Sequence, residues 1–350
     1  VTYTMPKGTG ELISNMWVEA KLTAAGTSKG SYVNWTNNTG AALIKECEIK
    51  IGSHSLEKHT SLWYDVSNEL MDHGNREHMS LNKHPGRNTY LRSNTGKLPN
   101  LHLNIPLKFW FNRNVGMALP VCALQQTDVK MKITYRNLKF LINKSSEDHG
   151  EVITIDPPSS DTIKLYADYI FLDTDEKMRF KQGTHEYLIE QVDINEDNVY
   201  ENSLKLNFSH PVKELIWVIR SKDVFKEVDA TIQTTTTVDS TKNNNLRIGN
   251  SFTGTAQSND YFNYSLLPMG STDTVEDLGL GYLYTNNFGE WFSDCKLHIN
   301  GSDRFEKRNP YYFRTIQPIQ SGHNIPSKHI YCYSFSINPE EHQPSGTINY

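Results

Sequence analysis

Short runs of alternating apolar and polar residues recur along the whole chain. In each run, β-branched or aromatic residues occupy every second position, which is the pattern of a half-buried antiparallel strand. The clearest runs lie at 17–22, 47–51, 101–107, 129–135, 163–170, 204–208 and 331–337. Clusters of turn-forming residues interrupt them at 37–40, 157–160 and 300–302. The pattern predicts an all-β protein of the sandwich or jelly-roll kind.

Two segments predict helices instead. Residues 60–73 place Leu62, Val66 and Leu70 at helical spacing. Residues 173–182 follow a predicted strand and begin with acidic side chains, which favour the positive end of the helix dipole: Asp173, Asp175 and Glu176. We therefore expect a few short helices beside the strands.

The chain is long enough for two domains. Its 350 residues exceed what one hydrophobic core usually fills. The predicted helix at 173–182 lies between two predicted strands, so we place the boundary there, with a first domain at 1–182 and a second at 183–350. Residues of about 221–290 lack clear periodicity and contain polar tracts. We expect them to form a long surface insertion that carries recognition.

One passage of the first half has a partial copy in the second. Residues 46–53 read Glu-Cys-Glu-Ile-Lys-Ile-Gly-Ser, and residues 294–302 read Asp-Cys-Lys-Leu-His-Ile-Asn-Gly-Ser. One inserted residue, Asn300, aligns them, and an aromatic pair follows each. Both passages predict a strand, a Gly-Ser turn and a return strand. The copy suggests that the two halves are versions of one sandwich, and its single long period excludes a solenoid or propeller.

The copy also bears on the chain ends. Two strands of the first half align with two of the second: 17–22 with 215–220, and 101–107 with 331–337. The counterpart of a predicted strand at 187–193 would precede Val1. Two first-half strands would have counterparts after Tyr350, namely 129–135 and 163–170. We therefore expect the chain to be incomplete at both ends, unless another chain supplies these strands, because unpaired sheet edges are poorly tolerated.

Composition and charge narrow the function. Hydrophobic residues make up 37% and aromatic residues 11% of the chain, which is typical of a folded protein. The net charge of −5 argues against a nucleic-acid coat, which needs an excess of Lys and Arg. No run of 18 apolar residues is present. The four cysteines lie far apart and are interpreted as reduced, mostly buried side chains: Cys47, Cys122, Cys295 and Cys332.

Candidate chemistry is sparse. Histidines are dense in one stretch, but their spacing does not favour a zinc site: His54, His59, His73, His78 and His84. Two groups of neighbouring carboxylates, one at the predicted helix start and the other at Glu340 and Glu341, are interpreted as capping or turn residues rather than an acid–base pair. We predict no catalytic residue, no cofactor and no metal. Among six Asn-X-Ser/Thr sequons, Asn263 and Asn300 are the better candidates for glycosylation.

Three long motifs resemble one family. Residues 107–120 read Leu-Lys-Phe-Trp-Phe-Asn-Arg-Asn-Val-Gly-Met-Ala-Leu-Pro. Residues 165–176 read Leu-Tyr-Ala-Asp-Tyr-Ile-Phe-Leu-Asp-Thr-Asp-Glu and lead into 185–191, and residues 331–346 form the third motif. In this order they resemble the major capsid proteins of the nucleocytoplasmic large DNA viruses, on the phycodnavirus, iridovirus and mimivirus side. One departure, Gln126-Thr127-Asp128 where the family often has a His-Glu pair, affects a local contact at a strand entry.

The resemblance implies two consecutive eight-stranded jelly rolls and no enzymatic activity. It further implies a homotrimer that forms a pseudo-hexagonal capsomer, with capsomers tiling the icosahedral shell of a large double-stranded DNA virus. The implied partners are neighbouring capsomers and minor capsid, cement and penton proteins. The shell would overlie an internal membrane without inserting into it or touching the genome, and the virion would assemble in the host cytoplasm.

An alternative from another class is a carbohydrate-binding or carbohydrate-active β-sandwich protein, since a fold does not fix a function. Aromatic side chains could stack on sugars at three places: Trp110, Tyr261-Phe262 and Tyr311-Tyr312. At strand positions such residues more often belong to a core or a subunit interface. A minor capsid or spike protein is disfavoured because the three motifs resemble those of the bulk shell protein.

Overall fold

The computed structural model describes most of the chain. The described residues are 1–25, 33–73, 98–124, 126–144, 154–155, 161–197, 203–220, 290–342 and 345–349, together with Ser159, Glu227, Asn259, Tyr261, Phe262 and Tyr264. Strands dominate this part of the chain, with a few short helices between them, as the sequence predicted.

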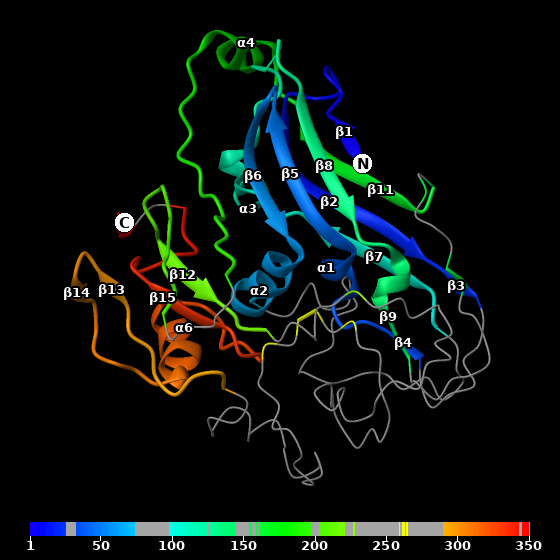
Figure 1. The fold of residues 1–350 in the computed structure, drawn as a ribbon. Coiled ribbons are helices and arrows are strands. Elements are labelled where there is room, and N and C mark those ends of the chain that lie inside the picture. Colours follow the sequence, from blue (N-terminus) through cyan, green and yellow to red (C-terminus); the bar gives the residue numbers. More distant parts are fainter. Residues whose placement is uncertain are drawn as a thin grey trace.

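The first half contains two antiparallel sheets. One has the strand order β1-β8-β5-β6, formed by Thr2–Thr4, Val129–Tyr135, Ile44–Ile51 and His54–Thr60. The other has the order β11-β2-β7, formed by Ile163–Ile170, Leu12–Leu22 and Leu101–Pro106. The sheets lie one in front of the other (Figure 1). Five of the predicted strands are therefore confirmed, and β8 and β11 have the predicted bounds.

The core of the first half lies between these sheets. Strand β2 buries Met16, Val18 and Ala20 and exposes or half-exposes the residues between them. Ile49 of β5 and Ile133 of β8 are fully buried in the same apolar cluster. Alternate residues of a strand point to opposite faces of its sheet. The alternation in the sequence therefore reports which face of each strand meets the core.

Smaller elements complete the first half. Two further pairs of short strands form, β3 (Ala24–Ala25) with β10 (Thr154–Ile155), and β4 (Val33–Trp35) with β9 (Ile142–Lys144). The short helical segments are α1 (Thr39–Leu43), α3 (Trp110–Arg113), η1 (Val115–Met117) and η2 (Leu138–Leu141).

Both predicted helices are confirmed. Helix α2 (Ser61–Met71) follows β6 directly and buries seven consecutive residues, from Tyr64 to Leu70. Helix α4 (Thr174–Gln182) buries none and projects from one end of the sheets (Figure 1). Asp173 caps α4, and its side chain and that of Glu176 form a capping box. The helix-start role predicted for these acids is thus confirmed.

The segment after α4 is extended but pairs with no strand. The strands predicted at 187–193 and 204–208 are therefore wrong. Gln191 Nε2 donates to the Leu56 carbonyl at 2.7 Å, and the Val192 amide donates to Glu57 Oε1 at 3.2 Å. These contacts hold the segment along β6, the edge strand of its sheet, where an uncovered edge would invite other chains to pair.

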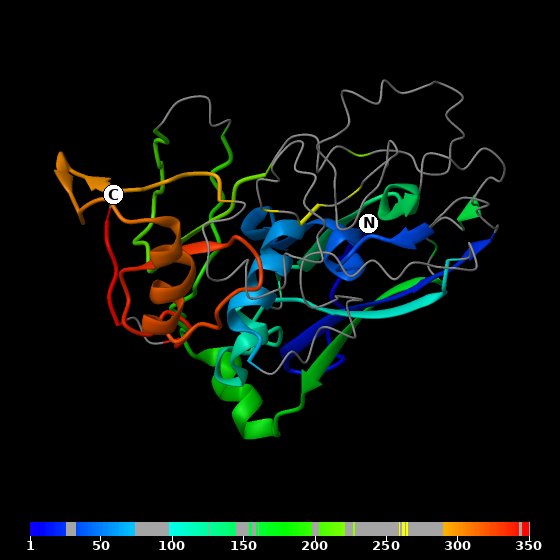
Figure 2. The same ribbon diagram turned by 90° about the horizontal axis from the view of Figure 1, so that it is seen from below.

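In the second half, the described strands are short. Strand β12 (Glu214–Trp217) pairs with β15 (Tyr331–Ser334), and β13 (His298–Ile299) forms a hairpin with β14 (Ser302–Asp303). A π-helical turn, η5 (Tyr312–Ile316), leads into α6 (Gln317–Gln320). The view from below shows this half beside the sheets of the first (Figure 2).

The order of elements repeats between the halves. In the first, strand β2 is followed by the β5–β6 hairpin, helix α2 and strand β7, and β7 pairs antiparallel with β2. In the second, β12 is followed by the β13–β14 hairpin, the helical pair η5–α6 and β15, and β15 pairs antiparallel with β12. The sequence copy at the two hairpins therefore marks a repeat of the surrounding elements.

The predicted surface insertion differs from expectation in part of its described residues: Glu227 is exposed, as expected, where it pairs with Lys45 and Arg136 of the first half. Four of its residues are almost fully buried there: Asn259, Tyr261, Phe262 and Tyr264. The Tyr261 hydroxyl donates to the Phe140 carbonyl at 2.7 Å, and Asn259 Nδ2 donates to the Ile142 carbonyl at 2.9 Å. The expectation of a surface position is wrong for these residues. Their aromatic rings pack in the first-half core, and the polar groups of Asn259 and Tyr261 donate to backbone carbonyls there. Most of 221–290 lies outside the described residues.

Candidate functional site

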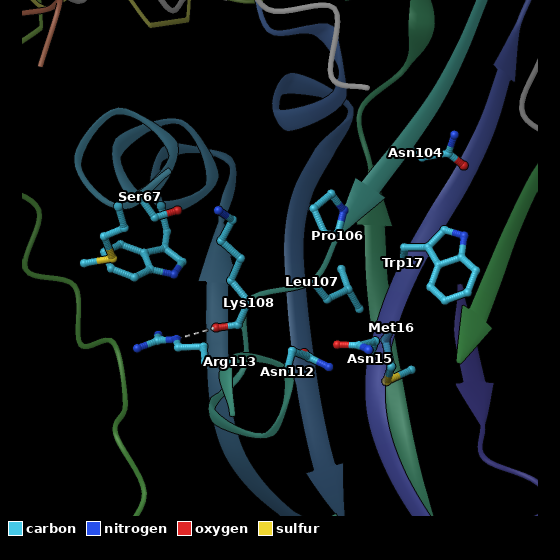
Figure 3. A pocket seen from close by; sticks show the side chains of 12 residues that line it. Asn15, Met16, Trp17, Ser67, Asn104, Pro106, Leu107, Lys108, Asn112 and Arg113 are labelled. Carbon is cyan, nitrogen blue, oxygen red and sulfur yellow. Dashed lines mark hydrogen bonds between the residues drawn. The ribbon is translucent and has the colours of Figure 1, made fainter. Parts of the chain in front are cut away.

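A groove of about 670 Å³ opens between helix α2 and the edge of the β11-β2-β7 sheet (Figure 3). Trp17 and Asn104 lie on its sheet side and Ser67 on its helix side. The Trp17 ring stacks on Tyr166, with centroids 5.5 Å apart. The twelve lining residues are Asn15, Met16, Trp17, Trp63, Ser67, Met71, Asn104, Pro106, Leu107, Lys108, Asn112 and Arg113.

The cations in this groove already have partners. Arg113 Nη1 lies 3.3 Å from Glu190 Oε2, and its guanidinium lies 5.8 Å from the centroid of the Trp63 ring. Lys108 Nζ donates to Asn68 Oδ1 at 2.5 Å. Among the described residues that line the groove, none is a carboxylate or a histidine. These residues offer apolar and amide contacts to another molecule and include no acid–base pair for catalysis.

A second polar site joins the two halves. Lys328 of the second half lies 2.7 Å and 2.8 Å from the two carboxylate oxygens of Asp65 on α2. Asp65 also accepts hydrogen bonds from Asn38 Nδ2 and from the Tyr264 hydroxyl, each at 2.7 Å. Burial raises the pKa of Tyr264 well above its usual value, and the Asp65 charge adds to this effect. The tyrosine therefore remains a hydrogen-bond donor.

Nearby contacts extend this junction. Glu69 Oε2 accepts from both the amide and the hydroxyl of Ser327, at 2.9 Å and 2.8 Å. In the second half, Arg314 of the π-helical turn lies 2.9 Å from Glu290, whose other carboxylate oxygen accepts from the Tyr331 hydroxyl. Arg314 and Glu290 neutralise each other, and two neutral donors of Ser327 hold the Glu69 carboxylate, so each of these buried groups has a hydrogen-bond or ion-pair partner.

Sequence reasoning did not find this junction. Asp65 and Lys328 are 263 positions apart. The available sign was local: Asp65 stands between Tyr64 and Val66 on the buried face of a helix, where a charge needs a partner.

The structure gives the candidate histidines structural surroundings. His59 is fully buried, lies 2.8 Å from Glu57 Oε1 and stacks on Phe109 with centroids 4.4 Å apart. His73 contacts Asn324 and Glu340. His78 and His84 lie outside the described residues. Within the described ranges, no three His, Cys, Asp or Glu side chains are arranged to hold a metal ion.

The cysteines follow the prediction in part. The described structure has all four as free thiols. Cys47 and Cys332 are buried, and Cys122 and Cys295 are half-buried. Burial raises the pKa of Cys47 to about 12.

The aromatic candidates for sugar stacking lie mainly in the core. Trp110, Tyr261 and Phe262 are each less than 10% exposed, and Tyr311 and Tyr312 are half-buried. A stacking platform needs open ring faces, so these rings do not favour the carbohydrate alternative. Among the glycosylation candidates, Asn300 is exposed in the β13–β14 turn with a φ of 50°, and Asn263 lies outside the described residues.

Two family profiles match the chain and together cover nearly all of it. The family described as "Major capsid protein N-terminus" matches residues 4–173. The family described as "Large eukaryotic DNA virus major capsid protein" matches residues 176–350. The chain belongs to the large eukaryotic DNA virus major capsid proteins.

Relatives agree with this assignment. The chain is 32% identical to the major capsid protein of Pyramimonas orientalis virus, over 97% of this chain and 73% of that protein. It is 29% identical to the major capsid protein of Paramecium bursaria Chlorella virus 1, over 97% of this chain and 70% of that protein. The predicted family and the predicted function, a major capsid protein of the icosahedral shell, are confirmed.

Solved structures of major capsid proteins share the fold. A quasi-atomic structure of the PBCV-1 virus capsid matches with a TM-score of 0.66 and 27% identity, over 99% of this chain and 76% of that one. The Faustovirus major capsid protein matches with a TM-score of 0.63 over 99% of this chain and 81% of that one, at 12% identity. The second match supports the fold alone. The family is one of structural capsid proteins. Among the described helices, none is long and apolar enough to span a membrane.

Proposed function

We propose that three copies of this capsid protein form one capsomer with a pseudo-hexagonal outline. The observation that carries the proposal is the repeated order of elements, with β2 paired to β7 in one half and β12 paired to β15 in the other. A chain with two similar sandwiches contributes six of them to a threefold assembly. Such a trimer fills a site with six neighbours while keeping closed cyclic symmetry.

Each half of the capsid protein is proposed to be one eight-stranded jelly roll, with domains at 1–182 and 183–350. Two observations support this boundary. Helix α4 buries none of its residues and lies between the halves in sequence. One family profile ends at residue 173 and the other begins at 176.

The proposed partners follow from the shell function. Trimers meet neighbouring trimers and minor capsid, cement and penton proteins, and the assembled shell overlies an internal membrane without entering it. Assembly takes place in the host cytoplasm and requires no cofactor, metal or catalytic residue. The net charge of −5 supports a shell that does not contact the genome.

Asn300 is the proposed glycosylation site that the structure describes. It is exposed in the hairpin turn and begins the sequon Asn300-Gly301-Ser302. Peptide mass spectrometry of protein from virus particles should find a glycan there. Asn37 begins another sequon but is 7% exposed, so its peptide should be unmodified. An unmodified Asn300 peptide would refute the assignment.

Electron cryomicroscopy of the purified capsid protein tests the capsomer proposal. Class averages viewed along the symmetry axis should show threefold particles with six lobes. Twofold particles, or particles with only three lobes, would contradict the account.

A further inference from the structure

His323 lies between two carboxylates in the second half. Its side chain is fully buried, with Nδ1 2.6 Å from Glu340 Oε1 and Nε2 2.8 Å from Glu214 Oε2. A neutral imidazole has only one N–H, whereas the protonated ring donates from both nitrogens. Because both nitrogens face carboxylate oxygens, this arrangement favours a protonated His323.

A second histidine continues the contact into the first half. His73, two residues beyond α2, places Nε2 2.9 Å from Glu340 Oε2 and Nδ1 2.9 Å from Asn324 Oδ1. Asn324 Nδ2 donates to the Asp72 carbonyl at 3.0 Å, so its Oδ1 is the atom that faces the ring. Both nitrogens of His73 therefore also face acceptors. Glu214, His323, Glu340 and His73 form one hydrogen-bonded row, named the His–Glu row below.

The row crosses the boundary between the halves. The backbone N–H of Asn324 donates to the Leu70 carbonyl at 2.8 Å. This bond fixes the second-half loop that contains Asn324 on the last turn of α2. Glu214 begins β12, and Glu340 lies in the turn after β15. The row thus ties α2 to two elements of the second half at one point.

The row is balanced in charge only when both rings are protonated. Two carboxylates then face two imidazolium groups, and the helix C-terminus favours the positive charge on His73. Lys213 does not supply this positive charge in place of the imidazolium groups. Its Nζ binds Glu190 Oε1 at 2.5 Å and the Glu341 carbonyl at 2.8 Å. The other ionisable groups that the structure describes on the packed elements are Tyr64, Asp65, Glu69, Asp72, Lys328, His329, Tyr331, Cys332, Tyr333, Glu341 and His342.

We propose that the His–Glu row is a protonation switch for the junction of the two halves. With both imidazoles protonated, it fixes the second half on α2. When they lose their protons at alkaline pH, each ring keeps a single N–H, so one of the two acceptors beside each ring is left facing a nitrogen lone pair and the junction loosens.

The direction of the pKa shifts agrees with this geometry. Burial acts to lower the pKa of His323, but hydrogen bonds to Glu214 and Glu340 outweigh it and raise the pKa to about 9. The hydrogen bond to Glu340 raises the pKa of His73. A histidine with a raised pKa stabilises the fold fully below its unfolded value, near 6.5, and loses that contribution as pH rises through the folded value. The window of the switch is therefore about pH 6.5 to 9.

Urea unfolding of the full chain across pH 6.5 to 9.5 tests the switch. The folding equilibrium constant of the unmodified protein should fall by on the order of one hundredfold more than that of His323→Gln, which has no titrating ring at this position. His102→Gln is the matched control, because His102 pairs with Glu19 at 2.8 Å on the exposed surface of the first half. This control should keep the pH dependence of the unmodified protein.

A second variant keeps the test decisive if His323→Gln does not fold. The His73 side chain is about half exposed, so His73→Gln leaves the core intact. The His73→Gln variant should show a smaller pH dependence of stability in the same window. In the unmodified protein, hydrogen exchange at residues 323–330, corrected for the intrinsic pH effect, should rise between pH 7 and 9. In the variant this rise should be lost. A pH dependence that is the same in both variants and the unmodified protein would overturn the proposal.

Discussion

Lys328 donates to both carboxylate oxygens of Asp65, and the two side chains are 5% and 0% exposed. The ammonium group also lies 5.3 Å and 5.6 Å from the ring centroids of Phe262 and Tyr264. Three distant parts of the chain therefore meet at one buried charge: α2, the segment before β15, and the anchored part of the predicted insertion.

Lys328→Met should destabilise the protein strongly. Removing one partner of a buried ion pair leaves the other charge buried without compensation, which costs about 3–5 kcal/mol. Urea denaturation at neutral pH measures this loss. Lys58→Met is the control, because Lys58 lies 2.8 Å from Glu46 with both side chains about half exposed. That variant should lose less than about 1 kcal/mol, and equal losses in the two variants would show that Asp65 is solvated.

Phe262→Ala should destabilise the first half although Phe262 follows it in sequence. Phe262 is 4% exposed within the apolar cluster of the first half, and truncating such a ring costs about 3–5 kcal/mol. Hydrogen exchange in β5 and β8 should rise in this variant. Phe171→Ala, at a ring that is 73% exposed, should change stability by about 0.5 kcal/mol or less. Unchanged exchange in β5 and β8 would contradict the anchoring role.

Thiol reagents should distinguish the cysteines by burial. Cys47 and Cys332 are about 0% and 1% exposed, and burial raises the pKa of each thiol. The thiolate is the reactive form, so these two should resist modification at pH 8. Titration with Ellman's reagent should find at most two reactive thiols in the folded protein and four in urea. Four fast-reacting thiols in the folded protein would refute the packing around β5 and β15.

DNA binding should be weak and lack a steep salt dependence. A chain with a net charge of −5 cannot release many phosphate counterions. Fluorescence anisotropy with labelled duplex DNA measures this affinity. Any affinity found should fall by less than about 10³-fold between 50 and 200 mM salt. A fall of that size or larger would indicate that the protein contacts many DNA phosphates and would contradict the prediction.

The strands that the sequence predicted best are those with a core on one face. Val129–Tyr135 and Ile163–Ile170 alternate because every second residue of each strand packs against the core between the two sheets, mostly buried in the first strand and mostly half-buried in the second. The segment at 187–193 alternates for another reason: Tyr187 and Ile189 pack on the core while the backbone runs beside β6 without a strand ladder. Alternation of apolar and polar residues indicates an extended segment with one face buried. It does not indicate whether the backbone of that segment hydrogen-bonds to a neighbouring strand.

The contacts between the halves could not be predicted in this way. Asp65 and Lys328, or His73 and Glu340, are brought together by the packing of elements more than 250 positions apart. A single sequence carries no record of such pairs. The burial of Asn259 and Tyr264 was missed because their surroundings read as polar and aperiodic, whereas the Tyr261-Phe262 pair was interpreted as more typical of a core or an interface.

The molar mass of the purified protein in solution tests the central claim most directly. Light scattering after size-exclusion chromatography at micromolar concentration should give about three times the chain mass of 40.1 kDa, without dissociation on dilution. A trimer is what the paired β2–β7 and β12–β15 halves predict for a shell subunit. A single species at 40.1 kDa would contradict the proposed capsomer.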